Sequence, residues 1–305
     1  MLDQLFLLLA LTVLAAVPLV LAALGGTCSE RSGVVNIALE GILLAGAFGT
    51  AVIAYASGSA WLGLAGGIAA GVLAAALHAL MTVTTKVDQI ISGLAINILV
   101  AGVTEYGAKL VWKESASRTI ALLPAWTPKG DSSLLFLISS ILGRPLVLAT
   151  ILLVVAAWLL ITRTRYGLRL RAVGENPAAC DTLGLSVGGL RYSGVLLSGG
   201  LGGLGGAWLA FDIAQFQHNM SAGKGFIAMA AVVCGKWHPL GAAAACLLFA
   251  FASALAKSCE RWKVNVPSEL ISTLPYVLTM IAVAGLVGRA RPPAALGTPY
   301  EKGAK

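Results

Sequence analysis

The sequence predicts an all-α integral membrane protein with about nine transmembrane helices, because its composition leaves too little polar surface for a soluble domain. The 305 residues are 58% hydrophobic and only 11% charged, whereas soluble domains are about 25% charged. Glycine occurs 36 times and aromatic residues make up 7%, which is typical of closely packed helices rather than of a strand-alternating barrel. Each span needs roughly 20 apolar residues, so about eight to ten spans fit.

Charge, cysteine content and motifs exclude several classes of function. The formal net charge of +8 fits arginine and lysine in cytoplasmic loops, so we expect no nucleic-acid partner. The five cysteines include no C-x-x-C pair, which predicts neither a disulfide framework nor a zinc site. The chain contains no phosphate-binding loop motif, no H-E-x-x-H motif and no nucleophile elbow. We therefore expect no metal site, no bound cofactor and no catalytic residue in this chain.

Eight apolar runs are predicted to cross the membrane. They cover residues 5–24, 34–55, 61–81, 90–111, 145–161, 191–211, 240–256 and 270–287. Asp3 precedes the first run in place of a basic region, and this run exceeds a signal-peptide core of about 7–15 residues, so we expect a retained span. A further apolar piece, residues 226–234, is too short to cross alone.

Arginine-rich intervals predict the orientation of the spans. Residues 162–191 hold five arginines, and the tail after Gly288 holds two arginines and two lysines, so both are expected on the cytoplasmic side. The chain must then cross an even number of times between them. We expect a half-helix at 226–233, a break at 235–239 and a return helix at 240–256. Counting backward predicts about nine crossings with the N-terminus outside.

Two short internal matches predict an inverted repeat, with chance similarity of common apolar residues as the alternative. Residues 89–94 align with 269–274, and residues 33–38 resemble 225–230. Inverted repeats with broken helices are a transporter architecture with the substrate path at the repeat interface. We expect one transmembrane domain over 1–305, divided into a first repeat (about 1–111), a linker helix and cytoplasmic loop (about 133–190), a second repeat (about 191–288) and a cytoplasmic tail (289–305).

Four polar residues within apolar runs are candidates for the substrate path: Asn36, Glu40, Gln89 and Asn97. Asn36 and Glu40 are four residues apart, so we expect them on one face of a helix entering the membrane. A carboxylate at membrane depth indicates function or a buried partner, and the alternative for Glu40 is that it lies at an interface or caps a neighbouring helix end. Gln89 and Asn97 lie on a small and polar stripe, which fits a water-lined path and a close helix contact equally well. The stripe consists of Gln89, Gly93, Asn97, Ala101 and Thr104.

A glycine-rich run at residues 193–206 contains overlapping small-x-x-x-small spacings. Such spacings favour close contact of helix backbones in lipid. The alternative is an element that flexes during gating.

The arginine-rich interval also carries the signals of a short helix. Asn176 can cap its start, Pro177 suits the first helical position, and Gly184 stands where a C-cap is expected. The predicted product is a helix of about two turns lying against the membrane, with Ala178 and Leu183 available to a partner.

Five motifs are distributed along the chain. They are R-S-G-V-V-N-I-A-L-E-G, V-D-Q-I-I-S-G-L-A-I-N, Y-G-L-R-L-R-A-V-G-E-N-P-A-A, G-K-W-H-P-L-G-A and P-P-A-A-L-G-T-P-Y. Over essentially its whole length the chain resembles the permease subunits of ABC importers, a family that includes branched-chain amino acid and ribose permeases. The N-I-A-L-E-G and A-L-G-T-P-Y segments are most similar to the nucleoside and simple-sugar branch, whose complexes work with lipoproteins of the basic-membrane-protein type.

The resemblance implies a nucleoside permease in the bacterial inner membrane, itself without enzymatic activity. It also implies three partners: a second, related permease; ABC ATPase subunits that bind ATP and Mg²⁺; and an extracytoplasmic substrate-binding lipoprotein. Coupling to the ATPase is assigned by resemblance to Glu175, Asn176, Pro177, Ala178, Leu183 and Gly184. The alternatives are a permease for simple sugars or branched-chain amino acids, an ion-coupled secondary transporter, and a membrane-embedded scaffold subunit.

Overall fold

The computed structural model describes residues 2–114, 116–126, 133–261, 273, 277 and 290–302, and within them the regular structure is helical. The helices are α1 (Leu2–Arg31), α2 (Leu39–Ser57), α3 (Ala60–Ala79) with a π-helical turn η1 (Leu80–Thr84), α4 (Gln89–Trp112), α5 (Ser133–Leu142), α6 (Pro145–Arg163), α7 (Arg165–Glu175), α8 (Pro177–Thr182), α9 (Val187–Asp212), α10 (Lys224–Cys234) and α11 (Pro239–Arg261). Seven helices in the described ranges are long and apolar enough to span a membrane.

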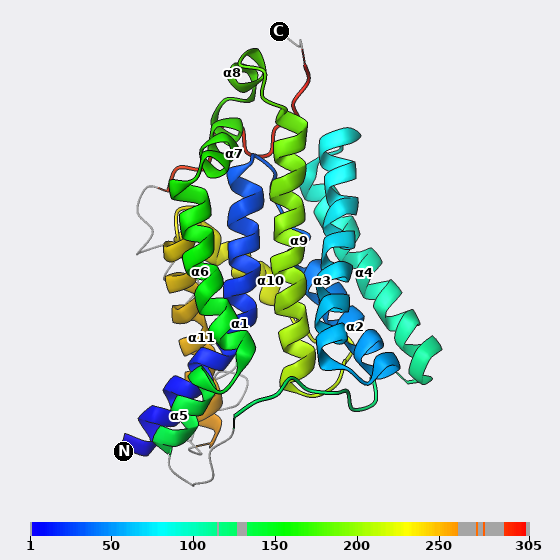
Figure 1. Cartoon of the computed structure of the whole chain (residues 1–305), viewed down its shortest axis with the longest axis vertical. Coiled ribbons are helices and arrows are strands. Elements are labelled where there is room, and N and C mark those ends of the chain that lie inside the picture. The colour runs from blue at the N-terminus through cyan, green and yellow to red at the C-terminus, as the bar shows by residue number, and fades with distance from the viewer. Residues whose placement is uncertain are drawn as a thin grey trace.

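The helices form an elongated bundle with α1 and α9 running side by side through its middle (Figure 1). Helices α6 and α11 lie on one flank, and α2, α3 and α4 lie on the other. Helices α7 and α8 and the tail of residues 290–302 lie at one end, which we call the α7–α8 end. The N-terminus lies at the opposite end, the N-terminal end. The arginine-rich interval and the tail therefore share one end, as their common charge predicts.

Glycines allow α9 to pack against two other helices at backbone distance. A Cβ added to Gly203 would lie 2.5 Å from the Gly67 carbonyl oxygen and 3.1 Å from Cα of Gly71, both on α3. A Cβ added to Gly206 would overlap the carbonyl oxygen of Leu43 on α2. The structure thus agrees with the packing interpretation of the glycine run, because larger residues would force the three helices apart.

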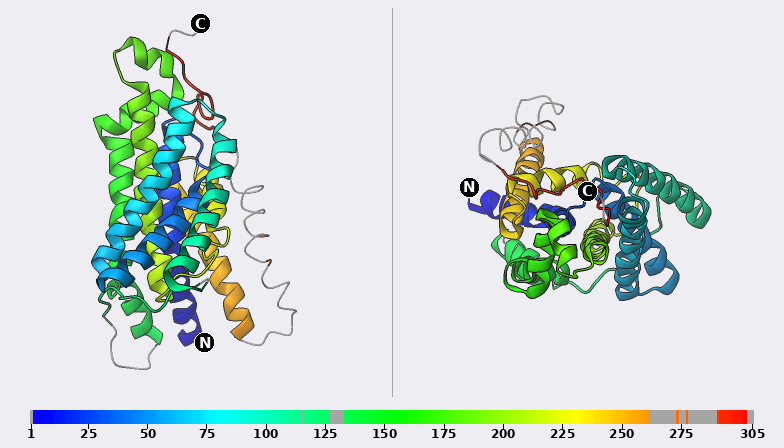
Figure 2. Two further views of the ribbon diagram at one scale, coloured as in Figure 1. Left: turned by 90° about the vertical axis from the view of Figure 1, so that its right-hand side faces the viewer. Right: turned by 90° about the horizontal axis from the view of Figure 1, so that it is seen from above.

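Most of the predicted spans correspond to helices of the structure. Seven of them correspond to α1, α2, α3, α4, α6, α9 and α11, and the predicted span at 270–287 lies outside the described residues except for 273 and 277. The short apolar piece forms α10, an 11-residue helix. Helix α11 then runs to the end of the bundle where the N-terminus lies (Figure 2). The predicted half-helix, break and return are therefore present.

The prediction that Asn36 and Glu40 share a helix face is wrong. Helix α1 ends at Arg31 and α2 begins at Leu39, and the intervening residues 32–38 are not helical. Gly33 adopts φ +92°, a left-handed conformation that favours glycine and stops the helix. We call residues 32–38 the unwound segment.

The same observation corrects part of the repeat alignment. Residues 33–38 are unwound, whereas residues 225–230, which resemble them in sequence, lie within α10. The match reflects shared apolar composition and not shared local structure. The other aligned pair cannot be compared, because residues 269–274 lie outside the described residues apart from 273.

Candidate functional site

The unwound segment lies among apolar helices, so its backbone groups need partners from the protein. Helix α1 supplies the first of them at its own end. The Ser29 hydroxyl donates to the Val34 carbonyl (2.8 Å), and the Val34 amide donates to the Ser29 carbonyl (3.3 Å). The remaining partners come from helices that are distant in sequence.

Helix α4 holds the unwound segment through two of the predicted path residues. Gln89 Oε1 accepts a hydrogen bond from the Val35 amide at 2.6 Å. Asn97 accepts from the Gly41 amide at 2.7 Å and donates to the Ile37 carbonyl at 2.9 Å. Two amide side chains, about two helical turns apart, therefore hold the segment at its middle and near its C-terminal end.

Asn36 connects the unwound segment to α9. Its side-chain amide donates to the Ser198 hydroxyl at 2.7 Å, and the residue is fully buried. Asn36 Oδ1 and Gln89 Nε2 are buried and have no hydrogen-bond partner within the described part of the chain. Buried polar atoms are costly to leave unpaired, so this region retains an unused acceptor and an unused donor.

Glu40 lies in the first turn of α2 and caps a different helix. Its two carboxylate oxygens accept hydrogen bonds from the amides of Gly223 (2.8 Å) and Gly225 (2.7 Å), at the N-terminus of α10. A carboxylate at a helix N-terminus satisfies unpaired amides and interacts favourably with the helix dipole. The alternative interpretation of Glu40, a cap on a neighbouring helix end, is therefore the one that the structure shows.

His78 on α3 is a partner of the unwound segment that the sequence analysis missed. One ring nitrogen lies 2.9 Å from the Val35 carbonyl oxygen and the other lies 3.0 Å from the Ser92 hydroxyl, with the histidine fully buried. The available signal was a single titratable residue inside a long apolar run, which needs buried polar partners. Asn36 and Glu40 thus lie within residues 32–41, and Gln89, Asn97 and His78 contact backbone groups of the same stretch.

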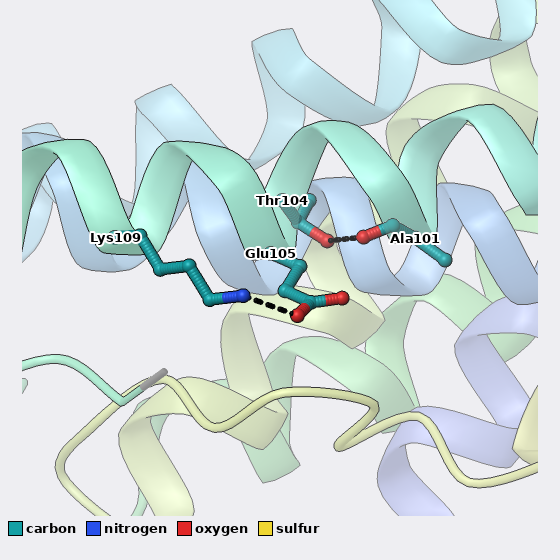
Figure 3. Close-up of polar contacts among 4 residues, drawn as sticks. All are labelled: Ala101, Thr104, Glu105 and Lys109. Carbon is teal, nitrogen blue, oxygen red and sulfur yellow. Dashed lines mark hydrogen bonds and ion pairs between the residues drawn. The ribbon is translucent and has the colours of Figure 1, made fainter. Parts of the chain in front are cut away.

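The outer part of the α4 stripe behaves differently (Figure 3). Thr104 donates its hydroxyl hydrogen bond to carbonyls of its own helix, at Val100 and Ala101. Glu105 forms an ion pair with Lys109 at 2.7 Å on an exposed face. Thr104 and Glu105 bond within α4, so the hydrogen bonds from the stripe to other parts of the chain are made by Gln89 and Asn97.

The end of α1 is joined to the break between α10 and α11. The buried Glu30 carboxylate accepts a hydrogen bond from the Trp237 indole, and Arg31 Nε donates to the Trp237 carbonyl at 2.8 Å. Lys236 and Trp237 have positive φ values of 56° and 54°. Two polar side chains of α1 therefore hold a strained turn, a role that the sequence analysis did not assign to them.

The predicted short helix is present as α8. Asn176 Oδ1 accepts from the Ala179 amide at 3.0 Å, and Pro177 occupies the first helical position. Gly184 follows the helix with φ +78°, and its amide donates to the Asp181 carbonyl. Leu183 is 79% exposed. The helix therefore has the predicted start, end and accessible apolar residue. It follows α7 directly in the chain.

Apolar spans around an unwound segment that is held by polar side chains form an architecture found in membrane transporters with discontinuous helices. The family model described as branched-chain amino acid transport system / permease component matches residues 8–283. The chain belongs to this family, and it is a permease subunit of an ABC importer. The resemblance drawn from its motifs is thereby confirmed.

Three relatives are similar over nearly their full length. The guanosine ABC transporter permease protein NupQ of Bacillus subtilis is 41% identical, covering 96% of this chain and 95% of the relative. The nucleoside ABC transporter permease protein NupC of Lactococcus lactis is 37% identical, covering 93% of each. The putative glucose ABC transporter permease protein TsgC13 of Haloferax volcanii is 34% identical, covering 90% of each. These relatives are transport permeases and not enzymes.

Proposed function

We propose that this permease imports nucleosides and that the unwound segment borders their path. Support for the substrate class comes from the two relatives with the higher identities, which are named for guanosine and nucleosides. Neutral, hydrogen-bonding substrates suit a path bordered by side-chain amides, and Asn36, Gln89 and Asn97 supply them. Sugar import is the second candidate, because a relative named for glucose is 34% identical.

The observation that carries the path proposal is the set of side-chain hydrogen bonds that holds the backbone of residues 32–41. Substrate sites of transporters with discontinuous helices form where helices are broken and backbone groups are held by neighbouring side chains. One such break lies at residues 32–38. Hydrogen bonds of Asn36, Gln89 and Asn97 connect this break and the start of α2 to α4 and α9. Glu40 contributes by holding the N-terminus of α10 beside it.

The remaining parts of the transporter are proposed from the family and from the resemblance. They are a second, related permease, ATPase subunits that bind ATP and Mg²⁺, and an extracytoplasmic substrate-binding lipoprotein, assembled in the bacterial inner membrane. ATP hydrolysis takes place on the ATPase subunits. The arginines at the α7–α8 end support a cytoplasmic location for that end. The two-repeat division of the chain belongs to the same proposal.

We assign the residues from Glu175 to Gly184 to coupling with the ATPase. A short helix transmits motion only when both of its ends are fixed, and α8 has a side-chain cap at one end and a left-handed glycine after the other. The exposed Leu183 and Ala178 remain available to the ATPase.

The substrate is tested with the purified complex in proteoliposomes. ATP-dependent uptake of labelled guanosine is expected, with competition by other nucleosides and none by ribose, glucose or leucine. Competition by glucose in place of nucleosides would favour the sugar permease. Uptake driven by an ion gradient without ATP would contradict the class itself.

Asn97→Leu tests the path. The substitution removes both hydrogen bonds to residues 37 and 41, so uptake should fall while the complex still assembles. Thr104→Val is the control, because its hydroxyl bonds only carbonyls of α4 and its shape is kept. Transport kinetics of Asn97→Leu equal to those of Thr104→Val would remove Asn97 from the path.

A glycine inserted between Ala179 and Cys180 tests coupling. The insertion breaks the rigid helix, so the complex should still bind the lipoprotein but lose uptake per ATP hydrolysed. A glycine inserted between Pro124 and Ala125, in a non-helical connection at the opposite end of the bundle, serves as the control. Unchanged uptake per ATP in the α8 insertion would show that α8 is a solvated connection and not a coupling helix.

A further inference from the structure

The tail of residues 290–302 crosses the α7–α8 end and contacts three parts of the bundle there (Figure 1). The Ala295 amide donates to the Gly174 carbonyl at the end of α7 (2.8 Å). The Gly297 amide donates to the Gly33 carbonyl in the unwound segment (3.2 Å). The Thr298 carbonyl accepts from Arg191 Nη1 on α9 (2.9 Å). Four consecutive residues thus join α7, the unwound segment and α9.

Arg191 is the buried end of this connection. Only 2% of the residue is exposed, and its Nε and Nη2 atoms have no hydrogen-bond partner within the described ranges. No ion pair of Arg191 occurs among the described residues. A buried guanidinium is costly unless it is bonded. The tail carbonyl at Thr298 is the partner that the structure gives to this charge.

Backbone contacts between the connected parts are close. A Cβ on Gly174 would overlap the Arg31 carbonyl oxygen, and a Cβ on Gly33 would lie 3.1 Å from Arg191 Nη2. Gly297 has φ +81°, which lets the tail turn over Val35. The end of α7 and the start of the unwound segment therefore touch directly, and the tail bonds to both.

Weaker contacts continue along the tail. The Ala294 amide donates to Glu175 Oε2 at 3.2 Å, beside the start of α8. Glu301 pairs with Lys86 at 2.7 Å and Lys302 with Asp181 at 3.6 Å, all with exposed or partly exposed side chains. Exposed ion pairs contribute little to stability, so the main connection is made by the residues up to Thr298.

We propose that residues 290–298, the tail strap, fasten the end of α7, and through it α8, to the unwound segment, with Arg191 as the positioning residue that anchors the strap. This inference rests on the proposed function of α8 and extends it. Movement of α8 reaches the path only if the end of α7 moves together with residues 32–38. The strap provides this linkage through hydrogen bonds to Gly174 and Gly33, and Arg191 keeps the strap seated on α9.

The test uses the full transporter complex in proteoliposomes with three variants. Arg191→Met removes the anchor from the α9 side. Gly297→Pro removes the amide that bonds Gly33 and imposes a φ near −65°, so it releases the strap without changing a membrane span. Lys302→Gln is the control, because Lys302 is 82% exposed and lies beyond the strap.

Two quantities are measured for each complex: amide hydrogen exchange at residues 294–296 and 298, and uptake per ATP hydrolysed. For Arg191→Met and Gly297→Pro we expect exchange at least about tenfold faster and uptake per ATP lowered by about threefold or more while hydrolysis continues, since a released strap lets α7 and α8 move alone. Lys302→Gln should change neither quantity.

Several outcomes would overturn the proposal. Faster exchange with unchanged uptake per ATP would show that the strap only covers the α7–α8 end. Unchanged exchange in both variants would show that Arg191 and Gly297 do not hold the strap. If Arg191→Met fails to assemble, Gly297→Pro decides alone. Failure of the α8 assignment is detected separately, by the glycine insertion in α8, which leaves the strap contacts in place.

Discussion

Glu40→Gln is the substitution whose consequence follows most directly from the geometry. In the native chain both carboxylate oxygens accept from backbone amides of α10, at 2.8 and 2.7 Å. Glutamine keeps one acceptor oxygen and turns an NH₂ group toward the other amide. One charge-assisted hydrogen bond is therefore lost, and the favourable interaction of a negative charge with the α10 dipole is lost with it.

The size of the effect follows from these two losses. A hydrogen bond to a charged group contributes about 1.5–3 kcal/mol, and a charge at a helix terminus contributes about 0.3–1 kcal/mol. Because the remaining oxygen still caps one amide, we expect a net cost of about 2 kcal/mol for releasing the N-terminus of α10. At about 1.4 kcal/mol per factor of ten, the released state becomes roughly 30 times more populated.

Amide hydrogen exchange of Gly223 and Gly225 in lipid nanodiscs measures this population. Glu105→Gln is the matched control, since Glu105 is 41% exposed and pairs with Lys109 one turn away (Figure 3), and exposed ion pairs contribute little to stability. Exchange at Gly223 and Gly225 no faster in Glu40→Gln than in Glu105→Gln would refute the capping argument. Lower uptake with unchanged exchange would instead assign Glu40 directly to the substrate path.

Two further predictions concern packing and thiol reactivity. Gly203→Val should abolish the folded-protein peak in size-exclusion chromatography, because its Cβ would lie 2.5 Å from the Gly67 carbonyl oxygen. Gly200→Val should elute normally, because the nearest neighbour atom to its Cβ is 3.8 Å away. Similar elution profiles of the two variants would contradict the close α3–α9 contact. Burial raises the pKa of the Cys180 thiol, so less thiolate is present at pH 8. Peptide-resolved mass spectrometry should therefore find its alkylation slower than that of a free cysteine, with a rise as the pH increases to 9. A rate equal to that of the detergent-denatured chain would show that Cys180 is accessible.

Hydropathy predicted most of the spans because each one buries a long apolar run, and this information is local. The short helix α8 was equally predictable, since Asn176, Pro177 and Gly184 act on backbone groups within a few residues of themselves. The half-helix α10 was identified by its length and by the side on which the flanking charges must lie.

The unwound segment could not be predicted in the same way. Residues 34–38 are mostly apolar and look like the start of a span, and the groups that stabilise the non-helical backbone are distant in sequence. Asn36 bonds a hydroxyl 162 residues away, and Val35 bonds Gln89 across 54 residues. The four path residues were recognised as unusual because of their polarity, but their partners depend on tertiary packing that no local pattern encodes.

The cap that Glu40 places on α10 has a consequence for biogenesis. An 11-residue helix is about 16 Å long, too short to be released into lipid as a span of its own. Its first amides bond a carboxylate that is made more than 180 residues earlier in the chain. Helix α10 therefore reaches its place against α1 and α2 only long after those helices have been made. Membrane insertion of this protein cannot be a strictly sequential release of one helix after another.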